Sequence, residues 1–329
     1  MANPAQTNSS VKTILLTGPD GFVGRALTRE LAKQGYRLRL ACRTANVATP
    51  ETGETICIGD IGPNTYWATA VVGCHAVVHL AARVHIMRDM SSDPPAEYRK
   101  TNVEGTRRLA QAASLAGVKR FIFLSSIKVN GEATNRTSGP FKDGDSPHPR
   151  DAYATSKWEA EQVLREIEQQ TDMQVVIIRP PLIYGPGVKA NFLELFQLIE
   201  SGLPLPFGGI KNKRSFLGLT NLVDLICCCL EQEEAAGETF LASDCDDVST
   251  PELGRRIAHA LARPARLMPI PEWAMKLGGM ITGKTDQVSR LCSSLQIDSS
   301  RLSRTLGWVP RCSMQEELAR IASWYKART

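Results

Sequence analysis

Short apolar runs rich in β-branched residues recur along the chain. Seven of them are predicted to be strands, and they cover residues 11–18, 36–42, 54–60, 75–82, 118–126, 173–181 and 237–243. Most are separated by stretches with helical periodicity. Parallel strands need long crossovers, and a parallel sheet is covered on both faces. The pattern therefore predicts an α/β fold with a doubly wound parallel sheet.

Three glycines follow the first predicted strand and open the next predicted helix. They are Gly18, Gly21 and Gly24 in "ILLTGPDGFVGRAL". Glycine lets the backbone turn tightly and approach a pyrophosphate, while the start of the helix supplies oriented N–H donors. This position predicts a Rossmann-type dinucleotide site, with the spacing GxxGxxG in place of the commoner GxGxxG.

The end of the second strand bears on the choice of dinucleotide. It reads "LACRT", without the acidic residue that normally accepts hydrogen bonds from the adenosine ribose of NAD. Arg43 could pair with a 2′-phosphate, although a solvated arginine at a strand end is the alternative. Asp60, at the end of the third strand, is expected at the adenine edge. NADP(H) is the preferred cofactor on this basis, and NAD(H) is the alternative.

The alternation loosens after Ile183 and gives way to loops and short helices with Pro and Gly punctuation. We expect a smaller, mostly helical substrate domain there. The predicted boundaries are 11–182 plus 215–244 for the dinucleotide-binding domain and 183–214 plus 245–329 for the substrate domain.

Composition excludes several classes of protein. The chain has 329 residues, 43% of them hydrophobic, and a net charge of +5, which indicates a globular protein without a nucleic-acid-binding arm. No signal segment or long apolar run is found, so a cytoplasmic protein without membrane insertion is expected. The nine Cys lack metal-ligand spacing, and we expect no metal and reduced thiols in the core, with Cys227–Cys229 in a buried helix.

A tyrosine and a lysine stand four residues apart in "DAYATSKWEAEQ", residues 151–162. This spacing makes Tyr153 and Lys157 neighbours on one helix face. A phenol ordinarily has a pKa near about 10, and a nearby ammonium favours its ionised form, as general acid/base catalysis requires. The pair alone is also common on solvated helices, so its meaning depends on context.

Five motifs occur in a fixed order: the glycine turn, "HLAAR", "SSIKVNG", "YATSK" and "RPPLIYGPG". With them the chain resembles the extended short-chain dehydrogenase/reductases, and among these the nucleotide-sugar enzymes related to UDP-glucose 4-epimerase. The resemblance extends from Lys12 to the terminal segment 306–326. "HLAARVHIM" and "SSIKVNGEAT" are most similar to bacterial O-antigen (lipopolysaccharide) enzymes that act on UDP-2-acetamido-2,6-dideoxyhexoses.

The resemblance implies a catalytic trio: Tyr153 as the acid/base for a sugar hydroxyl, Ser126 as its hydrogen-bonding partner, and Lys157 as the ligand of the cofactor ribose. Ser125 is the alternative to Ser126. Asn102 is expected to orient neighbouring loops or simply to pack. The cofactor-binding residues implied are Gly18, Asp20, Gly21, Phe22, Val23, Gly24, Arg43, Asp60, Ile61, Leu80, Ala81, Ala82, Asn102, Tyr153, Lys157 and Pro180.

Substrate contacts are also implied by the resemblance. Arg214 in "GGIKNKRSFLGLTNLVD" aligns with a diphosphate-binding arginine, and a guanidinium can grip phosphate oxygens in a bidentate way. Lys128 is interpreted as a solvated charge rather than a substrate contact, and Asn130 replaces a tyrosine of the related proteins. The full set is Arg83, His85, Ser126, Asn191, Arg214 and Arg290, with Phe192 as a further candidate.

Three functions are compared. The leading one is an NAD(P)-dependent reductase of the C4 ketone of a UDP-linked 4-keto-6-deoxy-N-acetylhexosamine, because a consumed reductant is often NADPH. A UDP-hexose or UDP-N-acetylhexosamine 4-epimerase with bound NAD would use the same trio, and a non-catalytic dinucleotide sensor is a distant third. A dehydratase is rejected because Ile127 and Lys128 stand where an acid and a base are needed. The resemblance also implies a homodimer.

Overall fold

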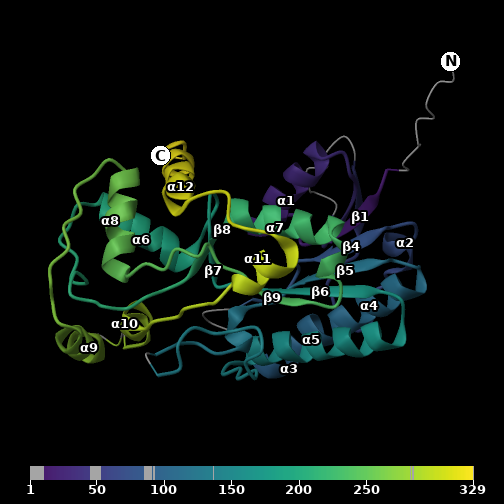
Figure 1. The fold of residues 1–329 in the computed structure, drawn as a ribbon, viewed down its shortest axis with the longest axis horizontal. Coiled ribbons are helices and arrows are strands. Elements are labelled where there is room, and N and C mark those ends of the chain that lie inside the picture. The colour runs from purple at the N-terminus through teal and green to yellow at the C-terminus, as the bar shows by residue number, and fades with distance from the viewer. Residues whose placement is uncertain are drawn as a thin grey trace, which may run out of the picture. The chain divides into compact units, whose positions relative to one another are not determined.

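The structure is a computed structural model that describes residues 11–44, 53–84, 91, 93–135, 137–281, 283 and 285–328. A seven-stranded sheet has the order β3-β2-β1-β4-β5-β6-β9 and is flanked by helices (Figure 1). Its strands are β1 (Thr13–Thr17), β2 (Arg37–Cys42), β3 (Gly53–Cys57), β4 (Ala76–His79), β5 (Arg120–Leu124), β6 (Gln174–Arg179) and β9 (Thr239–Leu241). The seven predicted strands and the α/β fold class are confirmed.

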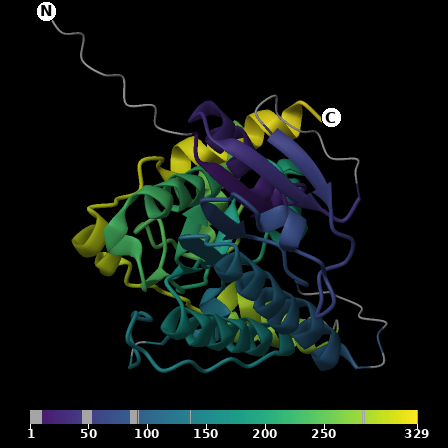
Figure 2. The ribbon, with the colours of Figure 1, turned by 90° about the vertical axis from the view of Figure 1, so that its right-hand side faces the viewer.

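The strands are apolar and buried because helices cover both faces of a parallel sheet. All four residues of β4 are buried, as are the last four of β1. The pairs β1–β2, β1–β4, β2–β3, β4–β5 and β6–β9 are parallel. The purple and blue strands at the start of the chain run side by side in Figure 2.

By its internal contacts the chain divides into two compact units, 1–123 with 162–175 and 124–161 with 176–329. The predicted domain boundaries remain predictions. The helices in the first part of the chain are α1 (Phe22–Lys33), α2 (Ala68–Val71), α3 (Pro94–Tyr98), a π-helix (Arg99–Glu104), α4 (Gly105–Leu115) and α5 (Ala152–Gln170). The π-helix was not predicted, and this element often marks functional sites.

The later part of the chain is mainly helical, as the sequence predicts. It contains α6 (Ala190–Glu200), α7 (Leu219–Glu231), α8 (Thr250–Ala260), α9 (Glu272–Ile281), α10 (Thr285–Cys292), α11 (Ser300–Leu306) and α12 (Met314–Lys326). Short strands β7 (Leu182–Tyr184) and β8 (Phe216–Gly218) form a parallel pair that was not predicted. In the described residues no helix is long and apolar enough to cross a membrane.

Five of the nine cysteines are buried, including Cys227 and Cys229 on the expected buried helix α7. Cys57 and Cys245 are exposed, so the prediction that the thiols are core residues is wrong for these two.

Candidate active site

The glycine turn has the geometry of a phosphate-binding loop. Gly18 directly follows β1 and has φ +69°, in the left-handed region that favours glycine. A Cβ at Gly24 would lie 2.0 Å from the carbonyl oxygen of Gly18, so only glycine allows α1 to pack this closely. Gly21 precedes α1, and no side chain caps the helix. The first N–H groups of α1 are therefore available to a pyrophosphate, and the turn fits a dinucleotide.

The other residues of this turn divide by exposure. Asp20 and Gly21 are exposed, Phe22 is half-buried, and Val23 is in the core. The backbone here can approach a cofactor, whereas the Val23 side chain serves packing.

Buried polar side chains brace the loop after β4. Thr17 Oγ1 lies 2.7 Å from His79 Nδ1 and accepts from the N–H groups of Leu80 and Ala81. Leu80, Ala81 and Ala82 are half-buried. The loop expected beside the cofactor is thus held by its own backbone hydrogen bonds to the end of β1.

Asn102 lies in the π-helix and is 2% exposed. Its Oδ1 accepts from the Arg83 N–H at 2.8 Å, and its Nδ2 donates to the Arg83 carbonyl at 3.0 Å. It therefore orients the loop after β4, as the first of its two expected roles requires. The Arg83 guanidinium lies over the Tyr98 ring, and His85 lies outside the described residues.

Arg43 and Asp60 are bound to each other. Arg43 Nε lies 2.7 Å from Asp60 Oδ1, with both side chains largely exposed. They meet because β2 and β3 are adjacent and parallel, so the carboxyl ends of the two strands lie together. From the sequence, Arg43 could pair with a 2′-phosphate, and in the structure it forms a solvent-exposed ion pair with a carboxylate. Ile61 follows, half-buried.

Ser125 and Ser126, which the sequence could not separate with certainty, have different surroundings. Ser125 is 4% exposed, and its Oγ donates to Glu161. Ser126 is half-buried, and its Oγ accepts the Lys128 N–H at 3.3 Å, a weak bond. The Ser125 hydroxyl is therefore engaged in the core, and the Ser126 hydroxyl is the better placed of the two for a ligand.

The segment after Ser126 is anchored on both sides. Ile127 belongs to an apolar cluster with Leu241 and Leu295, and its N–H donates to the Pro180 carbonyl at 2.9 Å. Pro180 is buried, and its carbonyl thus holds the Ser126 segment.

Tyr153 and Lys157 lie on α5, which Asp151 caps by accepting the Ala154 N–H at 2.7 Å. Tyr153 is half-buried, and Lys157 is 2% exposed with its Nζ donating to the Leu124 carbonyl at 2.7 Å. Burial lowers the pKa of Lys157 to about 7, and the negative charge of Glu161 opposes this shift. Burial therefore works against the charged form of this side chain, and Glu161 works in its favour.

A buried charged network lies under this part of α5 and was missed by the sequence analysis. Arg179 donates to both oxygens of Glu161, at 3.0 Å from Nε and 2.5 Å from Nη2. Its Nη1 donates to Asn130 Oδ1 at 2.9 Å. Asn130, the departure from the related motif, thus binds a core arginine. The i, i+4 spacing of Lys157 and Glu161 was the available signal, but the partner Arg179 is far away in sequence.

Lys128 is not a solvated charge, so that interpretation is wrong. Its Nζ lies 2.6 Å from Asp151 Oδ2 and 3.4 Å from Glu132 Oε1. Because Asp151 caps α5, Lys128 ties the Ser126 segment to the start of the helix that carries Tyr153.

The two substrate arginines are brought together. Arg214 Nη1 donates to the carbonyls of Arg290 and Ser293, at 2.9 and 3.0 Å. Burial lowers the pKa of Arg214, and the partners that its Nη1 has among the described residues are carbonyl and hydroxyl oxygens rather than carboxylates. A half-buried guanidinium held only by carbonyl and hydroxyl oxygens keeps its positive charge for an anion. Arg290 itself is exposed.

Two neighbouring residues on α6 differ. Asn191 is exposed, whereas Phe192 is 4% exposed and stacks on Tyr184 at 5.5 Å between ring centres. Phe192 is therefore a core residue, and its proposed contact with the nucleotide is wrong.

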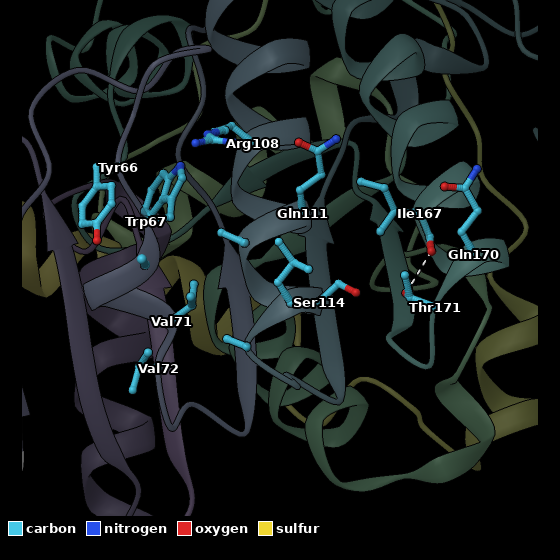
Figure 3. A pocket seen from close by; sticks show the side chains of 14 residues that line it. Tyr66, Trp67, Val71, Val72, Arg108, Gln111, Ser114, Ile167, Gln170 and Thr171 are labelled. Atoms are coloured by element: carbon cyan, nitrogen blue, oxygen red, sulfur yellow. Dashed lines mark hydrogen bonds between the residues drawn. The ribbon is translucent and has the colours of Figure 1, made fainter.

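A cavity of about 590 Å³ lies within the first compact unit, lined by α2, α4, the end of α5 and neighbouring residues (Figure 3). Its walls are mostly apolar, with Tyr66, Trp67 and Val72 on one side and Ile167 on another. None of the predicted site residues lines it, so it is not the candidate active site.

Comparison with known proteins gives a consistent family. The model of the NAD dependent epimerase/dehydratase family matches residues 14–242. A UDP-glucose 4-epimerase of Vibrio cholerae is 46% identical over 313 residues, 94% of each chain. An Escherichia coli O157:H7 N-acetyl-alpha-D-glucosaminyl-diphospho-ditrans,octacis-undecaprenol 4-epimerase is 30% identical over 94% of each chain.

Solved structures agree on the fold. A Bacillus cereus UDP-glucuronic acid 4-epimerase in complex with NAD has a TM-score of 0.76 at 20% identity, over 95% of this chain and 96% of its own. The seven-stranded sheet, the glycine turn and these matches lead to one conclusion: the chain belongs to the NAD dependent epimerase/dehydratase family.

Proposed function

We propose that the protein is an NAD-dependent 4-epimerase of UDP-linked hexoses or N-acetylhexosamines, in surface polysaccharide biosynthesis. The observation that carries this proposal is the 46% identity to the Vibrio cholerae UDP-glucose 4-epimerase over nearly the whole chain. The relative from Escherichia coli is also a 4-epimerase. These matches favour the epimerase, our earlier alternative, over the reductase, which they do not support.

The Arg43–Asp60 pair at the carboxyl ends of β2 and β3 supports NAD as the cofactor. Preference for NADP(H), and with it the argument for a consumed reductant, rested on a free Arg43. That guanidinium is paired with Asp60. A 2′-phosphate would have to compete with this carboxylate, whereas the two ribose hydroxyls of NAD would not.

The catalytic residues would act on the C4 hydroxyl of the sugar. Tyr153 takes the proton from the hydroxyl oxygen and later returns it, and Ser126 donates a hydrogen bond to the same oxygen. NAD, when bound, would supply a reversible acceptor for the C4 hydride, and return of the hydride to the opposite face would invert C4. Lys157 would hold the cofactor ribose, and its positive charge would favour the phenolate form of Tyr153.

Arg214 and Arg290 would bind the diphosphate of the substrate. Arg214, held by the carbonyls of Arg290 and Ser293, offers its charge to the diphosphate. Arg290 would make a second contact from the exposed side. A substrate held by its diphosphate leaves the sugar free to turn, as an epimerase requires.

We also propose that the protein is a homodimer whose two chains meet through a helix bundle that includes α5. Sedimentation equilibrium should give twice the mass of one chain, and a concentration-independent monomer would contradict it.

The proposed function is tested by measuring product formation and net oxidation or reduction of the cofactor in the same assay. UDP-glucose and UDP-N-acetylglucosamine are incubated with the protein and NAD, and the C4 epimers are measured by chromatography while absorbance at 340 nm is followed. Epimers should form without net absorbance change. Stoichiometric loss of absorbance with a UDP-4-keto-6-deoxy-N-acetylhexosamine and NADPH or NADH, without epimerisation, would establish the reductase instead.

Tyr153→Phe is the matched variant for this assay. It removes only the phenolic oxygen, so the rate should fall by roughly 10²–10⁴-fold while NAD still binds. Unchanged turnover, or loss of NAD binding together with loss of folding, would contradict the assigned role.

A further inference from the structure

Helix α9 carries an unusual concentration of exposed apolar side chains. Of the 14 large hydrophobic residues exposed in the described ranges, five lie between positions 268 and 281. They are Met268 at 42%, Trp273 at 71%, Leu277 at 49%, Met280 at 61% and Ile281 at 79% exposure. A single exposed apolar residue needs no explanation, but a cluster on one short helix does.

Four of these residues share one face of α9. An α-helix advances by roughly 100° per residue, so positions 273, 277, 280 and 281 fall within one stripe about 100° wide. Met275 and Gly279, the buried residues of the helix, lie on the opposite side. In a helix at the surface of a water-exposed protein, the outward stripe would normally be polar. In α9 the outward stripe is apolar instead.

Basic residues outnumber acidic ones around this stripe. The side chain of Lys276, which is 59% exposed, lies at its edge, with Nζ 4.0 Å from Glu272 Oε2, and Glu272 lies farther round toward the buried side. Over residues 263–290 the sequence has five basic and two acidic residues. Apolar residues including tryptophan, with cations beside them, suit the interface of a bilayer with anionic headgroups.

The size of the stripe argues for a lipid surface rather than a second copy of the chain. Ten residues make a helix about 15 Å long. Its four exposed side chains offer roughly 500 Å². A stable protein interface needs about 800 Å² from each partner. The helix is also too short to cross a membrane.

We propose that α9 docks the enzyme on the surface of an anionic lipid bilayer, with Trp273, Leu277, Met280 and Ile281 inserted at the level of the headgroups. This goes beyond the proposed epimerase, and the two can fail separately, because vesicle binding and turnover are measured independently. The segment that follows α9 supplies the carbonyls of Arg290 and Ser293 to Arg214, so α9 is joined closely in sequence to the candidate diphosphate site.

The test is flotation of the full chain with vesicles of phosphatidylglycerol and phosphatidylethanolamine. The protein should float with these vesicles, and much less with vesicles of pure phosphatidylcholine. Trp273→Ser combined with Ile281→Ser should weaken the binding at least about tenfold. Lys276→Glu should weaken it only at low salt, while Lys276→Arg should bind like the wild type.

A control pair carries the same chemical change elsewhere. Val72→Ser with Val309→Ser removes two exposed apolar side chains outside α9, at 62% and 55% exposure, and should leave flotation unchanged. Trp273→Phe should keep flotation but remove the shift of tryptophan emission on vesicle addition.

Three results would overturn the proposal. The wild type could fail to float with anionic vesicles, or the α9 pair and the control pair could float equally. The α9 substitutions could also leave flotation intact and abolish self-association, which would make this face a contact between copies.

Discussion

Ser125 and Ser126 are adjacent, but their surroundings decide which of the two hydroxyls is available to a ligand. Ser125 is sequestered by Glu161, while Ser126 makes only a weak bond to a backbone N–H. The family resemblance favours Ser126, and the structure supplies an independent reason, because a Ser125 hydroxyl engaged by a buried carboxylate is costly to redirect.

Alanine substitutions should separate these roles. Ser125→Ala leaves a buried carboxylate oxygen short of a donor and should lower the free energy of unfolding by about 1–3 kcal/mol. Ser126→Ala should change stability by less than about 1 kcal/mol but lower kcat by about 10²-fold or more. Urea unfolding and steady-state kinetics measure both. If Ser125→Ala is the variant that loses turnover while remaining stable, the two assignments are reversed.

Lys157 should make stability depend on pH near neutrality. Burial lowers its pKa in the folded protein to about 7, below that of the unfolded chain at about 10.4. Between these values the unfolded state binds more protons, so stability rises with pH. The gain from pH 6.5 to 8 should be about 1 kcal/mol.

The control for this prediction is Lys157→Met, which keeps the length of the side chain and removes the titration. Both proteins are measured without cofactor. The urea midpoint of the wild type should rise from pH 6.5 to 8, and that of the variant should lack this rise. Measurements should stop near pH 8, because burial raises the pKa of thiols such as Cys42 and Cys312, and this acts in the opposite direction. Parallel pH profiles for the two proteins would rule out Lys157 as the source.

At the scale of elements, the close packing of α1 on the glycine turn depends on the absence of a Cβ atom at Gly24. Gly24→Ala would ordinarily stabilise a helix by about 1 kcal/mol. Here the new Cβ would meet the Gly18 carbonyl, so α1 must shift. NAD binding should weaken by at least about tenfold, with lower stability, in titration calorimetry and thermal unfolding.

Gly144→Ala is the comparison, because its Cβ would meet nothing within 4 Å. It should bind NAD like the wild type. If Gly24→Ala also binds NAD with wild-type affinity, NAD binding does not require the close approach of α1 to the Gly18 carbonyl.

The elements themselves were largely predictable. Runs of β-branched residues marked all seven strands of the main sheet, although β9 has only three residues. β7 and β8 are equally short and were not predicted, and their pairing joins positions far apart in sequence.

At the scale of the whole molecule, the sequence suggested candidate site residues but not the partners that the fold gives them. The glycine turn, Ser126, Tyr153 and Lys157 could be proposed from the sequence because each belongs to a local motif. Arg179 and Asn130 were missed because only the fold brings them together. The Arg43–Asp60 pair could have been foreseen from two neighbouring parallel strands, and overlooking it led to the preference for NADP(H).

The most direct test of the central claim follows the hydride itself. UDP-glucose and UDP-N-acetylglucosamine deuterated at C4 are incubated with the protein in the presence of unlabelled NADH, and the products are analysed by mass spectrometry and NMR. A 4-epimerase returns the same hydride, so the account predicts C4 epimers that keep the deuterium at C4. Absence of any epimer, or products that have exchanged their deuterium for hydrogen from the added NADH, would contradict it.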